Sequence, residues 1–224
     1  YFKAFAPALG ATGRNRRPPR DPVNAVLSLS YTMLYAQATA ACWAAGLDPA
    51  YIPLAVDTKV YRPTFQATIE GATVNGRQFL ELPESAFVVG MVAMNKDHLD
   101  RKGWGEAFSA FAEFQRSHPN AILHVHTEKS GTGGGLLLPT LAKGCGIPDH
   151  AIRFTRQYAY MFSFPPHLMA LMYTAFDVLL APSAGEGFGV PLIEAQACGV
   201  PVITSDFTAQ AELVGKGWLV GGQR

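Results

Sequence analysis

The chain contains few charged residues and few cysteines. Only 16% of its 224 residues are Asp, Glu, Lys or Arg, whereas 49% are hydrophobic, so a sizeable core can form. The net charge of +1 argues against a dedicated nucleic-acid surface. The cysteine count, 3, is odd and no two are close in sequence, which disfavours a disulfide framework or a zinc site. We therefore predict a cytoplasmic location, with a membrane-peripheral one as the alternative, and neither a metal nor a nucleic-acid partner.

Long apolar runs and targeting signals are also missing. No run reaches the length of a transmembrane helix, and no signal peptide is evident. The chain opens at Tyr1 rather than Met, so we interpret it as a fragment, and a missing leader stays open. Its one basic cluster, Arg14 to Arg20, contains two prolines. It is typical of a solvated loop, with an anion-binding role as the alternative.

Strand and helix patterns alternate from Phe87 to Asp206. The apolar run 86–94 predicts a strand buried on both faces, and Phe108, Phe111 and Phe114 lie at helical spacing after it. Further strands are predicted within 120–128, 151–157, 177–183 and 201–206, and further helices within 136–146, 165–176, 191–198 and 208–215. This alternation predicts an α/β fold with a parallel, Rossmann-like sheet and helices on both faces. Ligands in such folds bind beyond the carboxyl ends of the strands.

The segment 64–85 has two interpretations. Asn75 and Gly76 are typical of a hairpin turn. Alternatively, residues 76–82 form a short helix, which we favour because the flanks lack clean alternation. Upstream, 50–63 is typical of a strand followed by a connection bounded by prolines, and we interpret it as a domain junction.

Two glutamates, Glu186 and Glu194, stand in an otherwise apolar, glycine-rich segment. Side chains on a helix tilt toward its amino end, so we expect Glu194 to reach the open mouth near Glu186. Loop N–H groups there can bind phosphate oxygens, and a carboxylate suits a sugar diol. The alternative is that Glu194 complements the helix dipole and Glu186 is solvated.

A basic pair, Arg101 and Lys102, precedes the helix predicted to begin near Trp104. Cations are unfavourable at the amino end of a helix, and a bound anion would reverse that preference. The alternative is an exposed pair of little energetic consequence. On these residues alone, the two interpretations are equally open.

The stretch GEGFGVPLIEAQACGVPVI (185–203) resembles the donor-site signature of retaining glycosyltransferases of family 4, the glycosyl transferases group 1. These have the GT-B fold, in which two Rossmann-like domains face each other across a cleft. The segments 51–63, 101–103 and 172–183 resemble further family elements in the same order. The resemblance implies that 87–224 is a truncated C-terminal nucleotide-sugar-binding domain, 53–86 the linker, and 1–52 the tail of the N-terminal acceptor domain.

The resemblance also implies roles for individual residues. Glu194 would bind the ribose hydroxyls, Glu186 would lie by the donor sugar and the reacting centre, and Lys102 with Arg101 would neutralise the pyrophosphate. The amides of Gly187, Phe188 and Gly189 would face the sugar and phosphates. Asn95 stands where the family often has an arginine, which makes it a further donor-binding candidate. These assignments are expectations for the structure to meet.

The implied activity is sugar transfer from a nucleoside-diphosphate sugar to an unidentified glycan, lipid or protein acceptor, with retention at the anomeric carbon. Such a hexosyltransferase would serve glycan biosynthesis and need no metal or other cofactor. One alternative is a non-catalytic fragment that binds nucleotide sugar but is inactive without its partner domain. Another is an epimerase or phosphorylase with the same fold.

Three weaker signals remain. Tyr158, Tyr160, Phe162 and Phe164 alternate, which favours a strand or loop with one face in the core over a ring that stacks on a nucleobase. The glycine-rich stretch 130–135 lacks phosphate-loop spacing, and we interpret it as a flexible, lid-like loop. His124 and His126 share a strand face, but without a third ligand we expect no metal there.

Overall fold

A computed structural model describes residues 56–96, 99–162 and 164–221, together with five single residues in helical conformation: Met33, Gln37, Ala40, Ala41 and Ala44. The chain divides into two compact units, Tyr1–Pro53 and Leu54–Arg224. The second unit contains all the strands of the described residues. The basic cluster at Arg14 to Arg20 lies outside the described residues.

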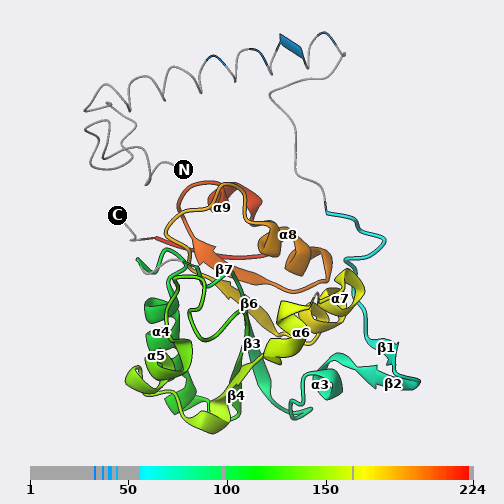
Figure 1. The fold of residues 1–224 in the computed structure, drawn as a ribbon, viewed down its shortest axis with the longest axis vertical. Helices are drawn as coiled ribbons and strands as arrows, with labels where there is room; N and C mark the ends of the chain where they lie inside the picture. Colours follow the sequence, from blue (N-terminus) through cyan, green and yellow to red (C-terminus); the bar gives the residue numbers. More distant parts are fainter. Residues whose placement is uncertain are drawn as a thin grey trace. The chain divides into compact units, whose positions relative to one another are not determined.

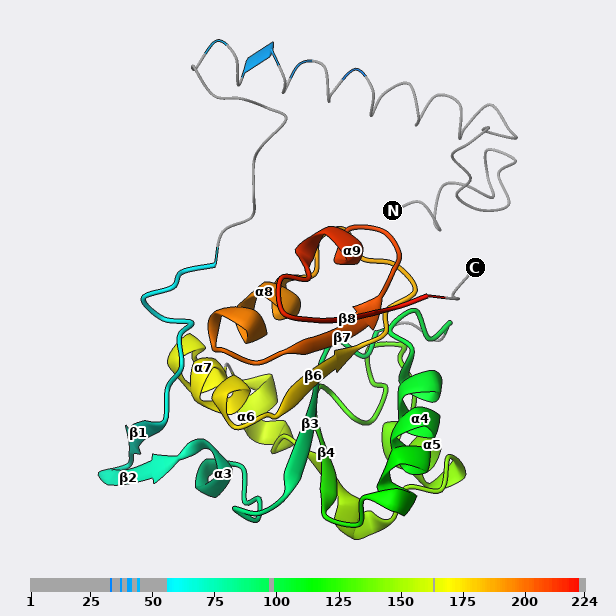
Figure 2. The same cartoon turned by 180° about the vertical axis from the view of Figure 1, so that it is seen from behind.

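The second unit is built on a six-stranded parallel sheet with the order β5-β4-β3-β6-β7-β8 (Figures 1 and 2). Its strands are β3 (Phe87–Val92), β4 (Ala121–His126), β5 (Ile152–Phe154), β6 (Val178–Ala181), β7 (Val202–Ser205) and β8 (Gly217–Val220). The first five confirm the strands predicted from the sequence, and β8 was not predicted. Parallel order places all the carboxyl ends along one edge.

Helices cover both faces of this sheet, which confirms the predicted Rossmann-like architecture (Figure 1). The helices between the strands are α4 (Trp104–Ser117), α5 (Leu138–Gly144), α6 (Gln157–Met161), α7 (Pro166–Thr174), α8 (Val190–Ala197) and α9 (Gln210–Leu213), with a 3₁₀ turn η2 (Asp149–Ala151). Helices α4 and α5 lie on one face, and α7 and α8 lie on the other (Figure 2). None of the helices in the described part is long and apolar enough to cross a membrane.

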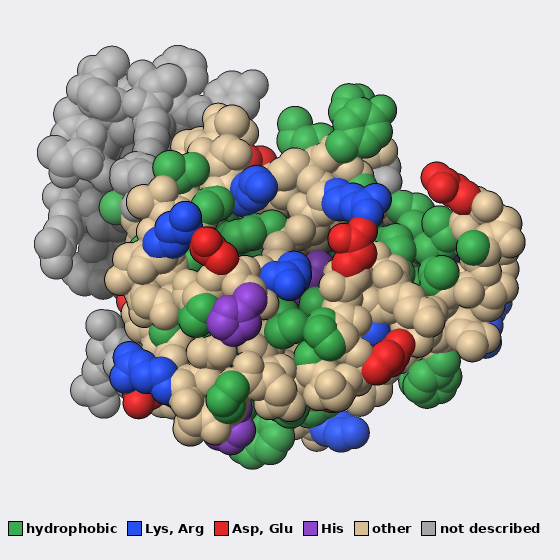
Figure 3. Space-filling model, turned by 90° about the horizontal axis from the view of Figure 1, so that it is seen from below, with side chains coloured by type: hydrophobic (Ala, Val, Ile, Leu, Met, Phe, Trp, Pro, Cys, Tyr) green, Lys and Arg blue, Asp and Glu red, His purple; other side chains and the backbone are tan. Residues whose placement is uncertain are grey.

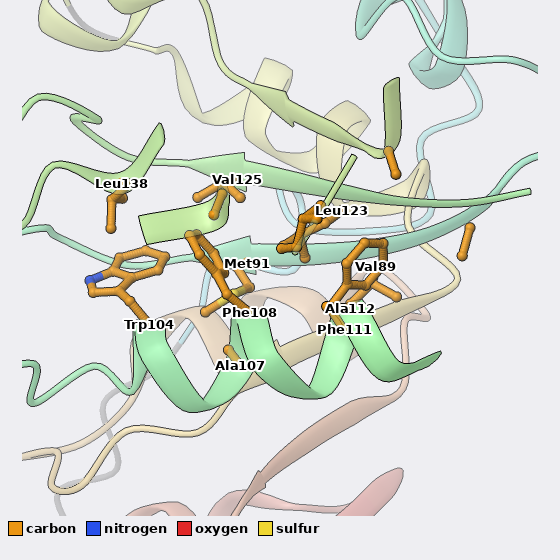
Figure 4. Close-up of a cluster of buried hydrophobic side chains, with 14 of the residues drawn as sticks. Val89, Met91, Trp104, Ala107, Phe108, Phe111, Ala112, Leu123, Val125 and Leu138 are labelled. Atoms are coloured by element: carbon orange, nitrogen blue, oxygen red, sulfur yellow. The ribbon is translucent and has the colours of Figure 1, made fainter. Parts of the chain in front are cut away.

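The core on the α4 face confirms the aromatic periodicity of that helix. Trp104, Phe108 and Phe111 are at most 3% exposed and point toward β3 and β4 (Figure 4). On the opposite face, Gly90 of β3 makes room for a ring, because a Cβ there would lie 2.1 Å from a ring carbon of Phe176. Residues of β3 belong to both cores. This packing fixes the position of the carboxyl end of β3 and of the loop that follows it, which carries Arg101 and Lys102.

The segment 64–85 holds both a hairpin and a helix, in successive positions. Strands β1 (Gln66–Ile69) and β2 (Ala72–Asn75) pair antiparallel around Glu70 and Gly71, whose φ angles of 50° and 85° suit a tight hairpin. Helix α3 (Gly76–Phe79) then begins at Asn75, whose side chain accepts from the Gln78 N–H at 2.8 Å. The predicted helix over residues 76–82 is confirmed, although it ends at Phe79. The alternative prediction of a hairpin turn at Asn75 and Gly76 is wrong, because the hairpin turns at Glu70 and Gly71.

The alternating aromatics after β5 do not form a strand. Residues 157–161 form the short helix α6. The rings of Tyr158 and of Phe162, which directly follows the helix, are tilted against each other with 4.6 Å between centroids, and both are largely exposed. Tyr160 and Phe164 instead pack on His126 at 5.1 and 5.0 Å. The period of two was therefore misleading, because one pair of rings lies in solvent and the other packs on His126.

Candidate functional site

The loops that follow β3 and β6 are fastened to each other at the carboxyl edge of the sheet. Gly103 has a φ of 69°, and a Cβ there would lie only 2.5 Å from the Pro182 carbonyl oxygen. The Arg101 carbonyl accepts hydrogen bonds from the Ser183 hydroxyl at 3.0 Å and from the Ala184 N–H at 2.8 Å. The basic pair and the glycine loop are therefore held as one unit.

Three of the predicted site residues meet across this junction. Lys102 Nζ forms an ion pair with Glu186 Oε1, and Arg101 Nη1 lies 3.5 Å from Glu186 Oε2. The side chains of Lys102 and Glu186 are 16% and 19% exposed, against 46% for Arg101. Burial by itself would raise the pKa of Glu186, but the hydrogen bond and charge of Lys102 outweigh it and lower the pKa. Glu186 is therefore held ionised.

The glycine loop carries free backbone donors. Within the described residues, the N–H groups of Gly187, Phe188 and Gly189 have no protein partner. Gly189 adopts a φ of 108° as it opens α8, which no side chain caps. The preceding amide, Glu186 N–H, donates to the Thr208 hydroxyl at 3.1 Å. Three unpaired donors at the start of a helix suit an anion.

The start of α4 differs from what the sequence suggested. The Asp100 carboxylate accepts from the Trp104 N–H at 2.7 Å and from the Gly105 N–H at 2.8 Å. The negative charges of Asp100 and Glu186 thus compensate the positive charges of Arg101 and Lys102 at the amino end of α4, without a bound anion. Sequence reasoning missed Asp100, although an Asp just before an apolar helix is a recognised start signal.

Glu194, on α8, is hydrogen-bonded to a tyrosine of the neighbouring helix. The Tyr173 hydroxyl of α7 donates to Glu194 Oε2 at 2.8 Å. Burial, together with the charge of Glu194, raises the pKa of Tyr173 and also that of Cys198, the latter to about 12. The structure gives no contact between the two predicted carboxylates among the residues it describes. Glu194 is therefore tied to α7, and its position at one mouth with Glu186 stays a prediction.

Asn95 is buried, and its side chain is committed to the backbone. Its amide donates to the carbonyls of Glu128 at 2.9 Å and Leu136 at 2.7 Å, and its oxygen accepts from the Leu136 N–H at 2.9 Å. A Cβ on Gly135 would lie 2.3 Å from that oxygen. Asn95 thus holds the glycine-rich loop to the end of β3, and the structure does not bring it together with Lys102 and Glu186.

The small cavity beside Glu186 identifies residues that the sequence did not single out. Its volume is about 30 Å³, close to that of one water molecule in the liquid. Its lining includes the predicted Lys102, Glu186 and Gly189, and adds Met91, Val92, Ala93, Leu180, Ala181, Ser183, Pro191, Leu192 and Gln210. The available signal was position: Ser183 and Gln210 are polar residues just beyond strand ends.

A larger groove shares Leu180 with this cavity. It measures about 700 Å³ and is lined mainly by apolar side chains, among them Phe111, Leu180, Ile203 and Trp218. Neither Lys102 nor Glu186 lines it. Basic and acidic side chains are interspersed on the face shown in Figure 3. Charged groups that could recognise a phosphate are therefore concentrated at the smaller cavity rather than in the groove.

His124 and His126 form a buried pair around Thr155. The Thr155 hydroxyl lies 3.3 Å from His124 Nε2 and 2.9 Å from His126 Nδ1. Burial lowers the pKa of His124 to about 3 and that of His126 to about 4. No set of three His, Cys, Asp or Glu side chains in residues 56–96, 99–162 and 164–221 is arranged to hold a metal.

Comparison with known proteins identifies the family to which the second unit belongs. Residues 86–223 match the family model described as glycosyl transferases group 1. The D-inositol 3-phosphate glycosyltransferase of Corynebacterium urealyticum is 34% identical over 167 residues, which cover 71% of this chain and 37% of that protein. The chain thus spans about a third of the length of such curated relatives.

Solved structures show the same architecture. The C-terminal domain of a glycosyl transferase group 1 family protein from Francisella tularensis aligns with a TM-score of 0.56 at 23% identity, over 75% of this chain and 81% of that one. An Anabaena protein in complex with UDP and glucose aligns with a TM-score of 0.53 at 20% identity, over 75% of this chain and 42% of that one. These likenesses support the fold.

The first part of the chain is similar to a different family. Residues 1–54 match the family model described as CRISPR associated protein Cas1. The CRISPR-associated endonuclease Cas1 3 of Thermus thermophilus is 47% identical over 68 residues, which are 29% of this chain and 20% of that protein. This similarity is an alternative to the prediction that residues 1–52 are the tail of a transferase acceptor domain, which stays a prediction. The two matches are separated near the boundary between the compact units at Pro53 and Leu54.

Proposed function

Because the chain belongs, over residues 86–223, to the glycosyl transferases group 1 family, we propose that it binds a nucleoside-diphosphate sugar for retaining glycosyl transfer. The observation that carries this proposal is the cluster of Lys102, Arg101 and Glu186 beside three amides that have no partner among the described residues. Cations and N–H donors at the carboxyl edge of a parallel sheet suit a diphosphate.

In this proposal, the basic pair and the loop amides stabilise the leaving group. Negative charge gathers on the diphosphate as its bond to the sugar breaks, and donors already in place lower the barrier. Lys102 has three N–H donors, so it can bind phosphate oxygens while it keeps one bond to Glu186. The Glu186 carboxylate then accepts from sugar hydroxyls near the reacting carbon.

Glu194 retains its proposed role at the ribose. A carboxylate offers about four lone-pair sites, so Glu194 can accept from Tyr173 and from ribose hydroxyls at once. Asn95 acts less directly, because it positions the loop 128–136 through backbone bonds. We propose that no metal or other cofactor takes part, and donor binding should then be unaffected by EDTA.

A thermal-shift panel tests the proposal directly, because a ligand that binds only the folded state raises the melting temperature. The panel contains UDP, GDP, UDP-glucose and GDP-mannose. We expect at least one pair to stabilise the chain, and Lys102→Ala to weaken that binding about tenfold or more, since it removes charge-assisted hydrogen bonds. Lys143→Ala is the matched control, because Lys143 is exposed and pairs only distantly with Asp149, at 3.9 Å. Failure of every compound to stabilise the chain would refute the proposal.

A non-catalytic binding domain is the second candidate, because the match to the transferase family covers residues 86–223 and residues 1–54 match another family model. Calorimetry beside a transfer assay separates the two, because binding without turnover identifies the binding domain. Product analysis separates transfer from epimerase or phosphorylase chemistry. The cytoplasmic location, with its membrane-peripheral alternative, stays a prediction.

A further inference from the structure

The segment that follows β7 supplies a third wall of the cavity beside Glu186. Gln210, the first residue of α9, is 1% exposed and lines this cavity together with Lys102 and Glu186. We propose that Gln210 Oε1 accepts a hydrogen bond from a hydroxyl of the donor sugar. This inference rests on the proposed function, and it adds a residue that contacts the sugar rather than the phosphates.

The orientation of the Gln210 amide is fixed by its nitrogen. Nε2 donates to the Ala181 carbonyl at 3.1 Å and to the Thr204 hydroxyl oxygen at 2.9 Å. The Thr204 hydroxyl donates in turn to the same Ala181 carbonyl, at 2.8 Å. A flipped amide would set Oε1 against the Ala181 carbonyl oxygen and would draw the Thr204 hydroxyl away from that carbonyl, so the network favours the present orientation. Oε1 therefore faces away from Ala181 and Thr204.

That oxygen is an acceptor without a donor. Gln210 Oε1 is buried and has no hydrogen-bond partner within the part of the chain that the structure describes. Buried polar atoms are nearly always hydrogen-bonded in native proteins, so this atom calls for a donor such as a ligand hydroxyl or a water molecule that the ligand displaces. The adjoining cavity is where such a donor can sit.

The chemistry of the oxygen selects the part of the ligand. An amide oxygen accepts hydrogen bonds, and so do phosphate oxygens, so the two do not attract each other. A sugar hydroxyl can donate. Lys102, on another wall of the cavity, supplies the charge that suits a phosphate. Gln210 thus offers a neutral acceptor to one sugar hydroxyl, and Lys102 offers a cation to the diphosphate.

The test compares ligands with and without the sugar in the full chain. By calorimetry, we expect Gln210→Met to leave the Kd of UDP within about twofold and to raise the Kd of UDP-glucose about three- to tenfold, the effect of one neutral hydrogen bond. GDP and GDP-mannose are the second pair. Gln196→Met is the matched control, because the Gln196 side chain makes only bonds to the backbone, to Leu192, Leu213, Gly215 and Lys216.

The outcomes separate this inference from the proposed function. If Gln210→Met changes the Kd of UDP and UDP-glucose by the same factor, Gln210 only braces β6 and β7, and the inference is overturned. If none of the four compounds binds the unaltered chain, the proposed function fails first. Should Gln210→Met not fold, deoxy analogues of UDP-glucose on the unaltered chain decide: one of them must lose affinity, and equal affinity for all of them rules out the contact.

Discussion

The hydroxyl of Tyr173, a fully buried residue of α7, donates at 2.8 Å to the carboxylate of Glu194 on α8. This bond ties the proposed ribose-binding carboxylate to the core. Replacing Tyr173 by Phe keeps the ring and removes the bond, so we expect a loss of about 1.5–3 kcal/mol in unfolding free energy, as for hydrogen bonds to charged groups. Urea denaturation measures it. Tyr158→Phe, on a ring 77% exposed, is the control and should change nothing.

Glu186 and a phosphate compete for Lys102 in the proposed site. Glu186→Gln removes the competing charge, so we expect UDP to bind as tightly or several-fold more tightly, while sugar transfer by the full-length enzyme falls at least tenfold. Calorimetry and a transfer assay provide the two readings. Glu113→Gln alters an exposed ion pair with Arg116 and should leave both unchanged. Weaker UDP binding in Glu186→Gln would contradict the competition.

The buried histidines make stability depend on pH. The folded pKa values of His124 and His126, about 3 and 4, lie below the ordinary value of 6.5, so the unfolded chain binds more protons in between. The stability that the neutral histidines contribute is fully present above pH 6.5. As the pH falls toward 4, the free energy of unfolding decreases by an amount on the order of a few kcal/mol. Urea denaturation between pH 8 and pH 4 measures the slope. His124→Leu should flatten it, whereas His150→Gln, an exposed site, should not.

Asn95 should act on stability more than on binding. Asn95→Ala removes three hydrogen bonds to the loop 128–136, so we expect a loss of about 1–3 kcal/mol and faster hydrogen exchange at Leu136. The Kd of UDP should change by less than about twofold, a small fraction of what one hydrogen bond to a charged group is worth. A large rise in Kd with normal exchange at Leu136 would instead return Asn95 to the donor-binding residues.

Residues 54–224 should fold and bind donor without the first unit. The two units separate at Pro53, and residues 1–54 match another family model. We expect the shortened chain to keep the melting temperature of its main transition and its Kd for UDP-glucose. A large loss of either would show that residues 1–52 belong to the transferase structure, as the sequence first suggested.

The order of strands and helices could be predicted because buried parallel strands leave long apolar runs, as in 86–94. A common site for Glu186, Lys102 and Arg101 was implied by the resemblance to the transferase family, and the loops that carry them meet because strand ends lie at one edge of a sheet. Strand β8 was missed because its residues are exposed and follow a short helix.

Side-chain partners were the least predictable part of the site. The direction of Glu194 depends on a tyrosine hydroxyl 21 residues away in sequence, and no local pattern announces that contact. Asn95 and Gln210 are likewise decided by carbonyls on other elements. Short-range spacing carries little information about bonds that only the packed tertiary structure creates.

The absence of a side chain at Gly103 has a consequence for evolution and engineering. Because the Pro182 carbonyl occupies the place of a Cβ at this position, even alanine would wedge the two loops apart and pull Lys102 away from Glu186. Gly103 needs no ligand contact for such an effect. In a saturation library screened for activity, we therefore expect substitutions at the exposed Arg101 to be tolerated better than substitutions at Gly103, where there is no room for a side chain.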